Sequence, residues 1–205
     1  MPNDTPIRLE PAQLPHAAEL LATAFQNDPT YILVQPDEIK RLRMLAWLFE
    51  RLLRYSLSYG QAYTTPALEG IACWLPPGRT NLSVLGLLRS GLATAPLVVG
   101  LAAYLRFDRY MSYADKLHEH YAPPSHWYLW VIGVEPAHQG RGIGSRLLQP
   151  VLAQASAEGT ACYLDTSTEG AVRFYEKHGF RVMEHGGTPN QEVQVWAMLR
   201  QPNLK

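Results

Sequence analysis

A glycine-rich segment in the second half of the chain has the composition of an anion-binding loop. Gly140, Gly142 and Gly144 lie within Gln139–Ser145, and a backbone without Cβ atoms can approach a ligand closely. A helix is expected to begin at the end of this segment, where the first amides have no intrahelical partner and carry the positive end of the helix dipole. A pyrophosphate suits such a cradle, and Arg141 adds a positive charge beside it.

The same glycines are compatible with more than one ligand. A P-loop requires Gly-Lys-Ser/Thr, which is absent here. A dinucleotide fingerprint, G-x-G-x-x-G, is matched at Gly140 and Gly142 but not at Ser145, although Asp165 follows after about 20 residues, as that fingerprint requires. The predicted strand ends near Val134, several residues before the glycines, which disfavours the dinucleotide. A dinucleotide-dependent oxidoreductase and a tight turn without a ligand stay open as alternatives.

The elements that would position this loop alternate between strand and helix. The predicted strands are Trp127–Val134, Ala161–Leu164, Phe180–Met183 and Val193–Leu199, the predicted helices are Gly144–Ala157 and Glu169–His178, and a turn is predicted at Gly186–Asn190. This alternation predicts an α/β domain whose sheet contains some parallel pairing.

The first half has a different pattern. We predict strands at Ile7–Leu9, Gln61–Thr65 and Gly70–Leu75, and helices at Pro11–Phe25 and Asp37–Tyr59, with a stop at Gln26–Pro29. An apolar helical region at Leu82–Leu105 and a more polar helix ending near His120 are predicted to follow. The stretch Leu82–Leu105 is strongly apolar, but Arg89 and Pro96 interrupt it. A bilayer span needs about 20 predominantly apolar residues, so we predict a buried helical region there rather than a membrane helix.

Composition narrows the possible partners. The 205 residues contain 18 Lys+Arg and 18 Asp+Glu, so no basic surplus favours nucleic acid. Cys73 and Cys162 lie in apolar runs and are predicted to be buried, reduced thiols. His118 and His120 do not share a helix face and have no evident third ligand, so no metal site is predicted. Met1–Pro6 lacks the features of a signal peptide, and a cytoplasmic protein without a membrane partner is expected.

Two signatures in register resemble those of the GNAT superfamily of N-acetyltransferases. Gln139-x-x-Gly142-x-Gly144, preceded by Val134-x-Pro136, is similar to the acetyl-CoA loop of that superfamily, and the run from Phe174 to Phe180 contains its Tyr-x-x-x-Gly-Phe. The resemblance extends from Tyr128 to Met198. More weakly, the chain is similar to the puromycin N-acetyltransferase-like branch, at the segments Phe25–Pro29, Trp74–Pro77, Trp127–Val134, Leu164–Ser167 and Val195–Met198.

The resemblance implies a fold and a co-substrate. It implies a mixed α/β acyl-CoA N-acyltransferase fold, with a mostly antiparallel central sheet, one splayed parallel pair and flanking helices. A single domain would span residues 1–205, with a helical acceptor-side insertion at 82–121 and an acetyl-CoA-binding core at 127–199. The residues implied to contact acetyl-CoA are Ile132, Gly133, Val134, Gln139, Gly140, Arg141, Gly142, Ile143, Gly144, Ser145 and Thr168, the last standing where many members have Asn.

The implied reaction is direct attack of a primary amine on the thioester. The amine must lose a proton, because a Lys-type amine has a pKa of about 10.4, the oxyanion needs a donor such as the Val134 amide, and the leaving thiolate needs a proton. Tyr175 is the implied general acid. Some members place a catalytic Glu where this chain has Tyr128, so Glu135, an ordered water and a proton route supplied by the substrate stay open as bases.

The acceptor is expected to be a small-molecule amine. Candidate substrate contacts are the aromatic residues Phe25, Trp74, Tyr128 and Trp130, with Asp28 as an anchor for a cationic amine or, alternatively, a helix-terminating residue. A non-catalytic acyl-CoA sensor is an alternative from another class. The resemblance also leaves open a homodimer formed through Val193–Leu199.

Overall fold

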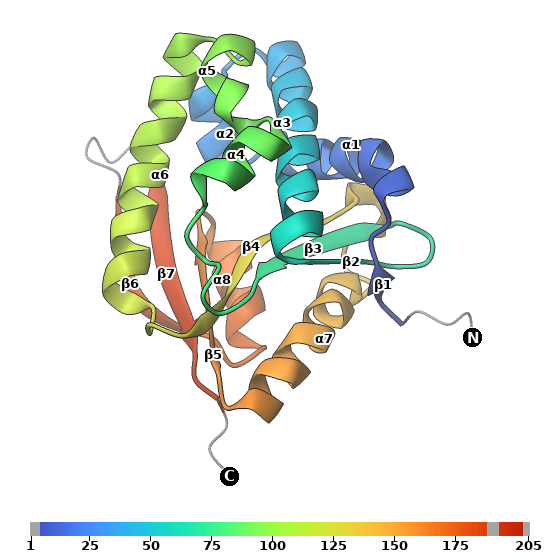
Figure 1. Cartoon of the computed structure of the whole chain (residues 1–205), viewed down its shortest axis with the longest axis vertical. Coiled ribbons are helices and arrows are strands. Elements are labelled where there is room, and N and C mark those ends of the chain that lie inside the picture. Colours follow the sequence, from blue (N-terminus) through green and yellow to red (C-terminus); the bar gives the residue numbers. More distant parts are fainter. Residues whose placement is uncertain (1–4, 188–192, 203–205) are drawn as a thin grey trace.

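A seven-stranded sheet forms the centre of the molecule. The computed structural model describes residues 5–187 and 193–202 (Figure 1). The strands are β1 (Ile7–Arg8), β2 (Gln61–Thr64), β3 (Gly70–Leu75), β4 (His126–Val134), β5 (Ala161–Thr166), β6 (Arg181–Gly187) and β7 (Gln194–Arg200). Their order is β1-β2-β3-β4-β5-β7-β6, and only β4 and β5 run parallel. The predicted mixed α/β sheet with one parallel pair is therefore confirmed.

The parallel pair opens into a fork. β4 and β5 pair over three positions, from His126↔Ala161 to Tyr128↔Tyr163. Beyond Tyr128, β4 continues to Val134 along β3 alone, while β5 continues along β7. The predicted splay between these two strands is present, and it leaves the remaining backbone of β4 without a strand partner on the β5 side.

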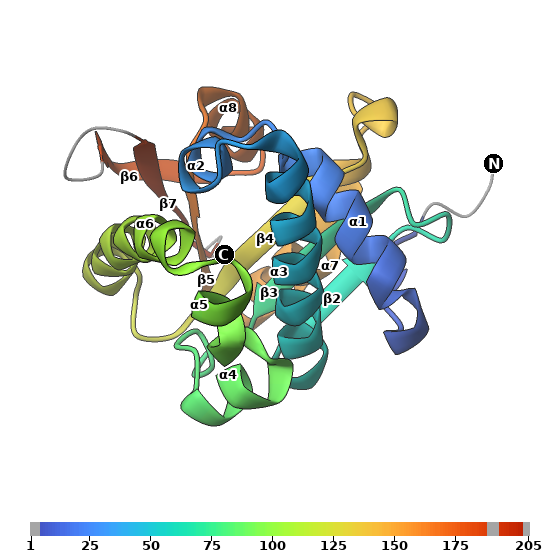
Figure 2. The same cartoon turned by 90° about the horizontal axis from the view of Figure 1, so that it is seen from above.

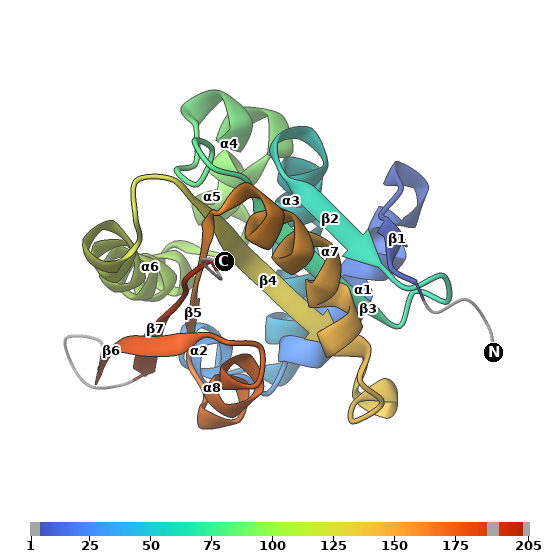
Figure 3. The ribbon, with the colours of Figure 1, turned by 90° about the horizontal axis from the view of Figure 1, so that it is seen from below.

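Helices cover both faces of the sheet. They are α1 (Leu14–Phe25), α2 (Pro29–Val34), α3 (Glu38–Tyr59), α4 (Val84–Ser90), α5 (Ala95–Val98), α6 (Leu101–Tyr121), α7 (Ile143–Glu158) and α8 (Glu169–Glu176). α1 and α3 cross one face (Figure 2), and α7 lies against the other (Figure 3). Because side chains alternate along a strand, Ile71 and Cys73 of β3 pack with α1 and α3, whereas Ala72 and Trp74 pack with α7.

The short helix α2 starts where the sequence predicts only a stop. Asp28 is extended and accepts a hydrogen bond from the Thr30 amide at 2.9 Å, and Pro29 occupies the first turn. An Asp cap followed by Pro is a helix start signal. Here the signal comes directly after the end of α1, so that the stop of one helix and the start of the next overlap in the sequence. Arg41 and Arg106 donate to the carbonyls of 26, 34, 35 and 36, which fixes α2 against α3 and α6.

The apolar stretch at 82–105 corrects a second prediction. It forms α4, α5 and the start of α6 rather than one buried helix, since Gly91 and Gly100 adopt positive φ between short helices. Val84 is 74 % exposed and Leu97 is 88 % exposed, because only one face of these helices packs inward. Within the described residues, no helix is both long and apolar enough to traverse a bilayer.

Three further predictions concern the two cysteines, the turn at Gly186–Asn190 and the last strand. Cys73 and Cys162 are both free and buried, as predicted. Gly186 and Gly187 belong to β6 rather than to a turn, and the rest of the predicted turn lies outside the described residues. β7 is hydrogen-bonded to β5 on one side and β6 on the other, so this strand offers no free edge to a second copy.

Candidate acceptor pocket and donor loop

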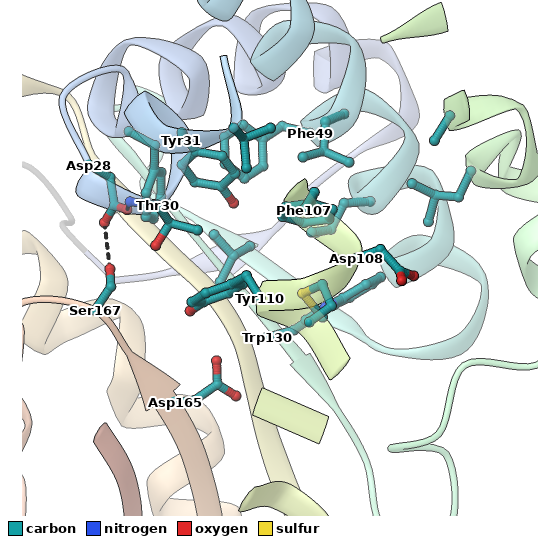
Figure 4. A pocket seen from close by; sticks show the side chains of 18 of the residues that line it. Asp28, Thr30, Tyr31, Phe49, Phe107, Asp108, Tyr110, Trp130, Asp165 and Ser167 are labelled. Carbon is teal, nitrogen blue, oxygen red and sulfur yellow. Dashed lines mark hydrogen bonds between the residues drawn. The ribbon is translucent and has the colours of Figure 1, made fainter. Parts of the chain in front are cut away.

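A cavity of about 560 Å³ lies over the fork. Its floor comes from β4 and β5, and its walls come from α2, α3 and α6 (Figure 4). The lining is mainly aromatic and aliphatic, and its larger rings are Phe25, Tyr31, Trp47, Phe49, Tyr104, Phe107, Tyr110, Tyr128, Trp130 and Tyr175. Such a mostly apolar cavity with a few polar groups is the usual form of a small-molecule site.

Every charged side chain on the pocket wall is acidic. Asp28, Asp108, Asp115 and Asp165 line the cavity, and no Lys, Arg or His among the described residues does so. Burial, followed by the charges of Glu119 and Asp108, raises the pKa of Asp115. The pocket therefore combines an apolar interior with a negative potential, which suits an organic cation.

Asp165 lies at the base of this pocket, two residues beyond the end of the β4–β5 pairing. The Tyr128 hydroxyl donates to its Oδ1 at 2.8 Å, and its carboxyl group points toward the ring of Tyr110 (Figure 4). Burial raises the pKa of Asp165 to about 6, although the hydrogen bond from Tyr128 lowers it. A carboxyl group of this kind can take or release a proton near neutral pH.

Tyr175 reaches the same pocket from α8. Its side chain is 7 % exposed and packs edge-on against Phe174 and Phe180. Burial, followed by the charge of Asp165, raises the pKa of Tyr175, so its hydroxyl stays protonated at neutral pH. That hydroxyl has no hydrogen-bond partner in the described part of the chain, which leaves its proton available to a bound group.

Asp28 accepts two structural hydrogen bonds at the edge of the pocket. Its Oδ1 accepts from the Thr30 amide and its Oδ2 accepts from the Ser167 hydroxyl at 2.9 Å. The second bond joins α2 to the segment after β5 and is drawn in Figure 4. Asp28 therefore caps the start of α2, rather than only ending the helix before it, and it also lines the pocket; its role as an anchor for a cationic amine stays a prediction.

The donor loop has the backbone geometry of an anion cradle. Gly140 and Gly142 adopt φ of 76° and 75°, a region that favours glycine. Gly142 precedes α7, whose N-terminus has no side-chain cap, so its first amides are free of side-chain acceptors. The Gln139 side chain donates to the Val134 carbonyl at 3.1 Å and ties the loop to β4.

The remaining predicted donor residues have defined positions. Ile132 and Thr168 line the pocket, and the Thr168 hydroxyl also accepts from Ala171 as the N-cap of α8. Gly133 faces α1, where a Cβ would approach Leu21 to 2.7 Å. Gly144 faces Phe174, and a Cβ added at Gly144 would lie 3.1 Å from the phenyl ring. Arg141 and Ser145 lie in the loop and in the first turn of α7, and Ile143 is buried beneath them.

The structure brings four of the five predicted substrate residues together. Phe25, Asp28, Tyr128 and Trp130 all line the pocket. Trp74 does not, and its assignment is corrected: its side chain is fully buried on the α7 face of the sheet. The alternation of side chains along β3 places it on the face opposite to the pocket.

Of the proposed bases, Glu135 is separated from the pocket. It follows the last residue of β4 and bonds His138 Nδ1 at 2.7 Å, and it is not part of the cavity wall. Asp165 fits the dinucleotide fingerprint and lies in the segment Leu164–Ser167 of the branch resemblance, but neither pattern predicts a base at this position. Its connection to Tyr128, 37 residues away, is a tertiary contact that no local spacing reveals.

A buried histidine pair was also missed. His118 Nε2 and His126 Nε2 are 2.7 Å apart, and His118 stacks on Tyr163 with an interplanar angle of 9°. Burial, followed by the charge of His126, lowers the pKa of His118 to about 4. The pair connects α6 to β4. No cluster of three or more metal-ligating side chains occurs within residues 5–187 and 193–202.

Comparisons with known proteins agree with this geometry. Residues 87–180 match the Acetyltransferase (GNAT) family. An uncharacterized N-acetyltransferase of Schizosaccharomyces pombe is 27 % identical over 97 % of this chain and 83 % of its own length. A Corynebacterium glutamicum structure described as histone acetyltransferase HPA2 and related acetyltransferase has a TM-score of 0.67 at 21 % identity, covering 98 % of this chain and 97 % of the other.

A third similar protein acts on a named amine. The Drosophila melanogaster polyamine N-acetyltransferase, an enzyme that catalyses the formation of N-acetylagmatine, has a TM-score of 0.60 at 12 % identity. The alignment covers 96 % of this chain and 99 % of that structure. At this level of identity the likeness concerns the fold.

Proposed function

Because the chain carries a GNAT-family acetyltransferase domain, we propose that it transfers an acetyl group from acetyl-CoA to the primary amine of a small organic cation. The observation that carries this proposal is the position of the acidic aromatic pocket directly over the β4–β5 fork. A donor that runs through the fork would present its thioester to an amine held in the pocket. Residues 127–199 would then form the donor core, and residues 82–121 would form the acceptor-side insertion.

The donor is assigned from the backbone. The unpaired part of β4, at Ile132 to Val134, offers backbone groups to the pantetheine amides, with Thr168 facing them across the fork. The pyrophosphate would rest on the loop from Gln139 to Ser145, where the uncapped start of α7 supplies amides and positive dipole. Arg141 would add its charge there.

The acceptor is assigned from the side chains. A cavity of about 560 Å³ has room for a small molecule. Its four acidic side chains and its many rings favour an ammonium on an apolar or aromatic body, through charge attraction and cation–π contacts. Asp108 and Asp115, both exposed on α6, would attract that cation toward the opening.

Tyr175 is assigned as the general acid. It lies in the pocket wall with a protonated hydroxyl that has no partner among the described residues. It would give its proton to the sulfur as the C–S bond breaks, and the Val134 amide would stabilise the oxyanion.

A thiol-release screen tests the function. The purified protein is given acetyl-CoA and a panel of aryl-alkyl amines, polyamines, aminoglycosides, aminonucleosides, amino acids and short peptides, with NAD(P)H binding measured in parallel. We expect release with small cationic amines that carry an apolar body. Release with peptides alone would contradict the acceptor class, and acetyl-CoA binding without any release would favour a non-catalytic binding module.

A further inference from the structure

We propose that Asp165 is the general base that takes the proton from the substrate ammonium, and that Tyr128 is the residue that positions it. This inference rests on the proposed function, because it concerns the same pocket and the same reaction. It assigns a role that the sequence analysis left open among Glu135, water and the substrate itself.

The position of Asp165 suits a base. It stands on β5 just after Tyr163, the last residue of β5 that pairs with β4, and so at the base of the fork. Its carboxyl group forms part of the pocket wall, as does Tyr175 on the neighbouring α8. A proton acceptor and a proton donor thus line one cavity, at the end where the two strands separate.

The hydrogen bonding of Asp165 leaves one oxygen for the substrate. Oδ1 accepts from the Tyr128 hydroxyl at 2.8 Å, and that contact fixes the orientation of the carboxyl group. Oδ2 has no hydrogen-bond partner within the described residues. An ammonium in the pocket can therefore donate to Oδ2 without displacing a protein group.

No Lys, Arg or His of the described residues lines the pocket around Asp165. The titratable groups that interact with its charge come from α2, α6, β4, β5 and α8 and are Tyr31, Tyr110, Asp115, Tyr128, Tyr163 and Tyr175. Burial raises the pKa of each of these tyrosines, so all stay neutral at physiological pH. Asp165, with its pKa near 6, is thus the group in this cluster that titrates near neutrality, where a general base works best.

The other acidic residues are less suitable. Asp28 has both oxygens engaged by Thr30 and Ser167. Asp108 and Asp115 are exposed on α6, where solvent screens their charges. Glu135 bonds His138 outside the pocket.

The proton balance of the reaction closes with these groups. The Asp165 carboxylate takes one proton from the ammonium, and the freed nitrogen lone pair forms a bond to the thioester carbonyl carbon. The C–S bond then breaks and its electron pair stays on sulfur, which takes the Tyr175 proton. The second proton lost by the nitrogen restores Tyr175, and Asp165 releases its proton to solvent, so that one proton is released for each amide formed.

The experiment compares Asp165→Asn with the wild type as a function of pH. With Asp165 as base, wild-type kcat/KM falls below about pH 6 and is level between there and the pKa of the amine. Asp165→Asn must use the small neutral fraction of the amine, so its kcat/KM should rise about tenfold per pH unit up to the amine pKa, which is about 10.4 for a Lys-type amine. Near pH 7 we expect a deficit of 10²–10⁴-fold, the typical value of a general base. Glu119→Gln, which makes the same carboxylate-to-amide change on α6 outside the pocket wall, is the matched control and should keep the wild-type profile.

Tyr128→Phe supplies a second readout that a purely structural role would not move. Its hydroxyl lowers the pKa of Asp165, so its removal should shift the acid limb of kcat/KM to higher pH. That shift decides the proposal if Asp165→Asn fails to fold, as judged by its melting curve.

The outcomes separate the two proposals. A wild type that acetylates amines, together with unaltered pH profiles in Asp165→Asn and Tyr128→Phe, overturns the base and leaves the proposed function standing. A wild type that binds acetyl-CoA but releases no thiol with any amine overturns the proposed function, and the assignment of Asp165 falls with it.

Discussion

The regions that we propose for the donor and for the acceptor are built in different ways. The donor region runs through one continuous segment, from β4 through the glycine loop to α7, and its features belong to the backbone: positive φ at Gly140 and Gly142, and uncapped amides. The acceptor pocket is made of side chains from α2, α3, α6, β4 and β5, such as Asp28 and Ser167, which are 139 residues apart. A backbone site leaves a local signature in the sequence, whereas a side-chain site depends on the tertiary fold.

Tyr175→Phe should have the largest effect, because Tyr175 lies where the two regions meet. Removal of its hydroxyl should lower kcat by about 10²–10⁴-fold, the usual worth of a general acid. The affinity for acetyl-CoA should be unchanged, since the ring and its contacts with Phe174 and Phe180 remain. Steady-state kinetics and calorimetry measure the two quantities.

Tyr104→Phe is the matched control for that change. Tyr104 also lines the pocket, but it comes from the first turn of α6. Equal losses in the two variants, or full turnover in Tyr175→Phe, would remove Tyr175 from the chemistry.

Gly142→Ala tests the donor region alone. An L-residue at this positive φ costs roughly 1–2 kcal/mol, which the loop can relieve only by shifting its amides. The affinity for acetyl-CoA should fall by about tenfold, since 1.4 kcal/mol is a factor of ten, and the KM of the amine should stay the same. Calorimetric titration with acetyl-CoA measures this.

Gly159→Ala is its control at the other end of the same helix. Gly159 has φ of 65°, and an added Cβ would meet no atom within 4 Å. The backbone strain is thus similar, while the position is remote from the loop. Equal weakening of acetyl-CoA binding in both variants would show that general destabilisation, rather than the cradle, is responsible.

The difference between the two regions also explains what the sequence could reveal. The parallel pairing in the sheet and the glycine loop were accessible because their signals are local: alternation of elements and spacing of glycines. The contact between Asp165 and Tyr128 at 2.8 Å was not, since it depends on strand pairing. Trp74 was assigned to the wrong face because its chemistry suits a pocket equally well on either side of β3.

The helical insertion shows the same limit. The apolar stretch at 82–105 predicts burial by its composition, yet Val84, Leu97 and Leu101 are exposed. Whether an apolar helix face is covered depends on which other elements pack against it. The sequence supplies the helix and its breaks but not that arrangement.

Removal of Asp108 and Asp115, the two exposed carboxylates of the pocket wall, tests the proposed acceptor region alone. Asp108→Asn combined with Asp115→Asn should raise the KM of a cationic amine several-fold and leave kcat and the acetyl-CoA affinity unchanged. The effect should shrink as salt is added, because the Debye length falls from about 10 Å at 0.1 M to about 3 Å at 1 M. Glu119→Gln, on the same helix but outside the pocket wall, should behave as wild type, and a salt-independent KM would argue against steering.

The smallest effect concerns the histidine pair His118–His126, which connects α6 to β4 of the sheet. His126 Nδ1 faces the Pro123 carbonyl, which can only accept, so Nδ1 carries the proton and the neutral ring uses Nε2 to accept from His118. Folding lowers the pKa of both rings, that of His118 to about 4, so the unfolded chain binds more protons between pH 6.5 and 4. The stability contributed by the neutral pair is complete above about pH 6.5 and is lost as the pH falls toward 4.

We expect Tm to fall by a few degrees across this range, since 1 kcal/mol shifts the Tm of a chain of this size by about 2–4 °C. His118→Phe keeps a ring against Tyr163 and should flatten that slope, whereas His120→Gln, on the exposed face two residues away, should preserve it; equal slopes in all three proteins would mean that the titration of His118 does not contribute to the pH dependence of stability.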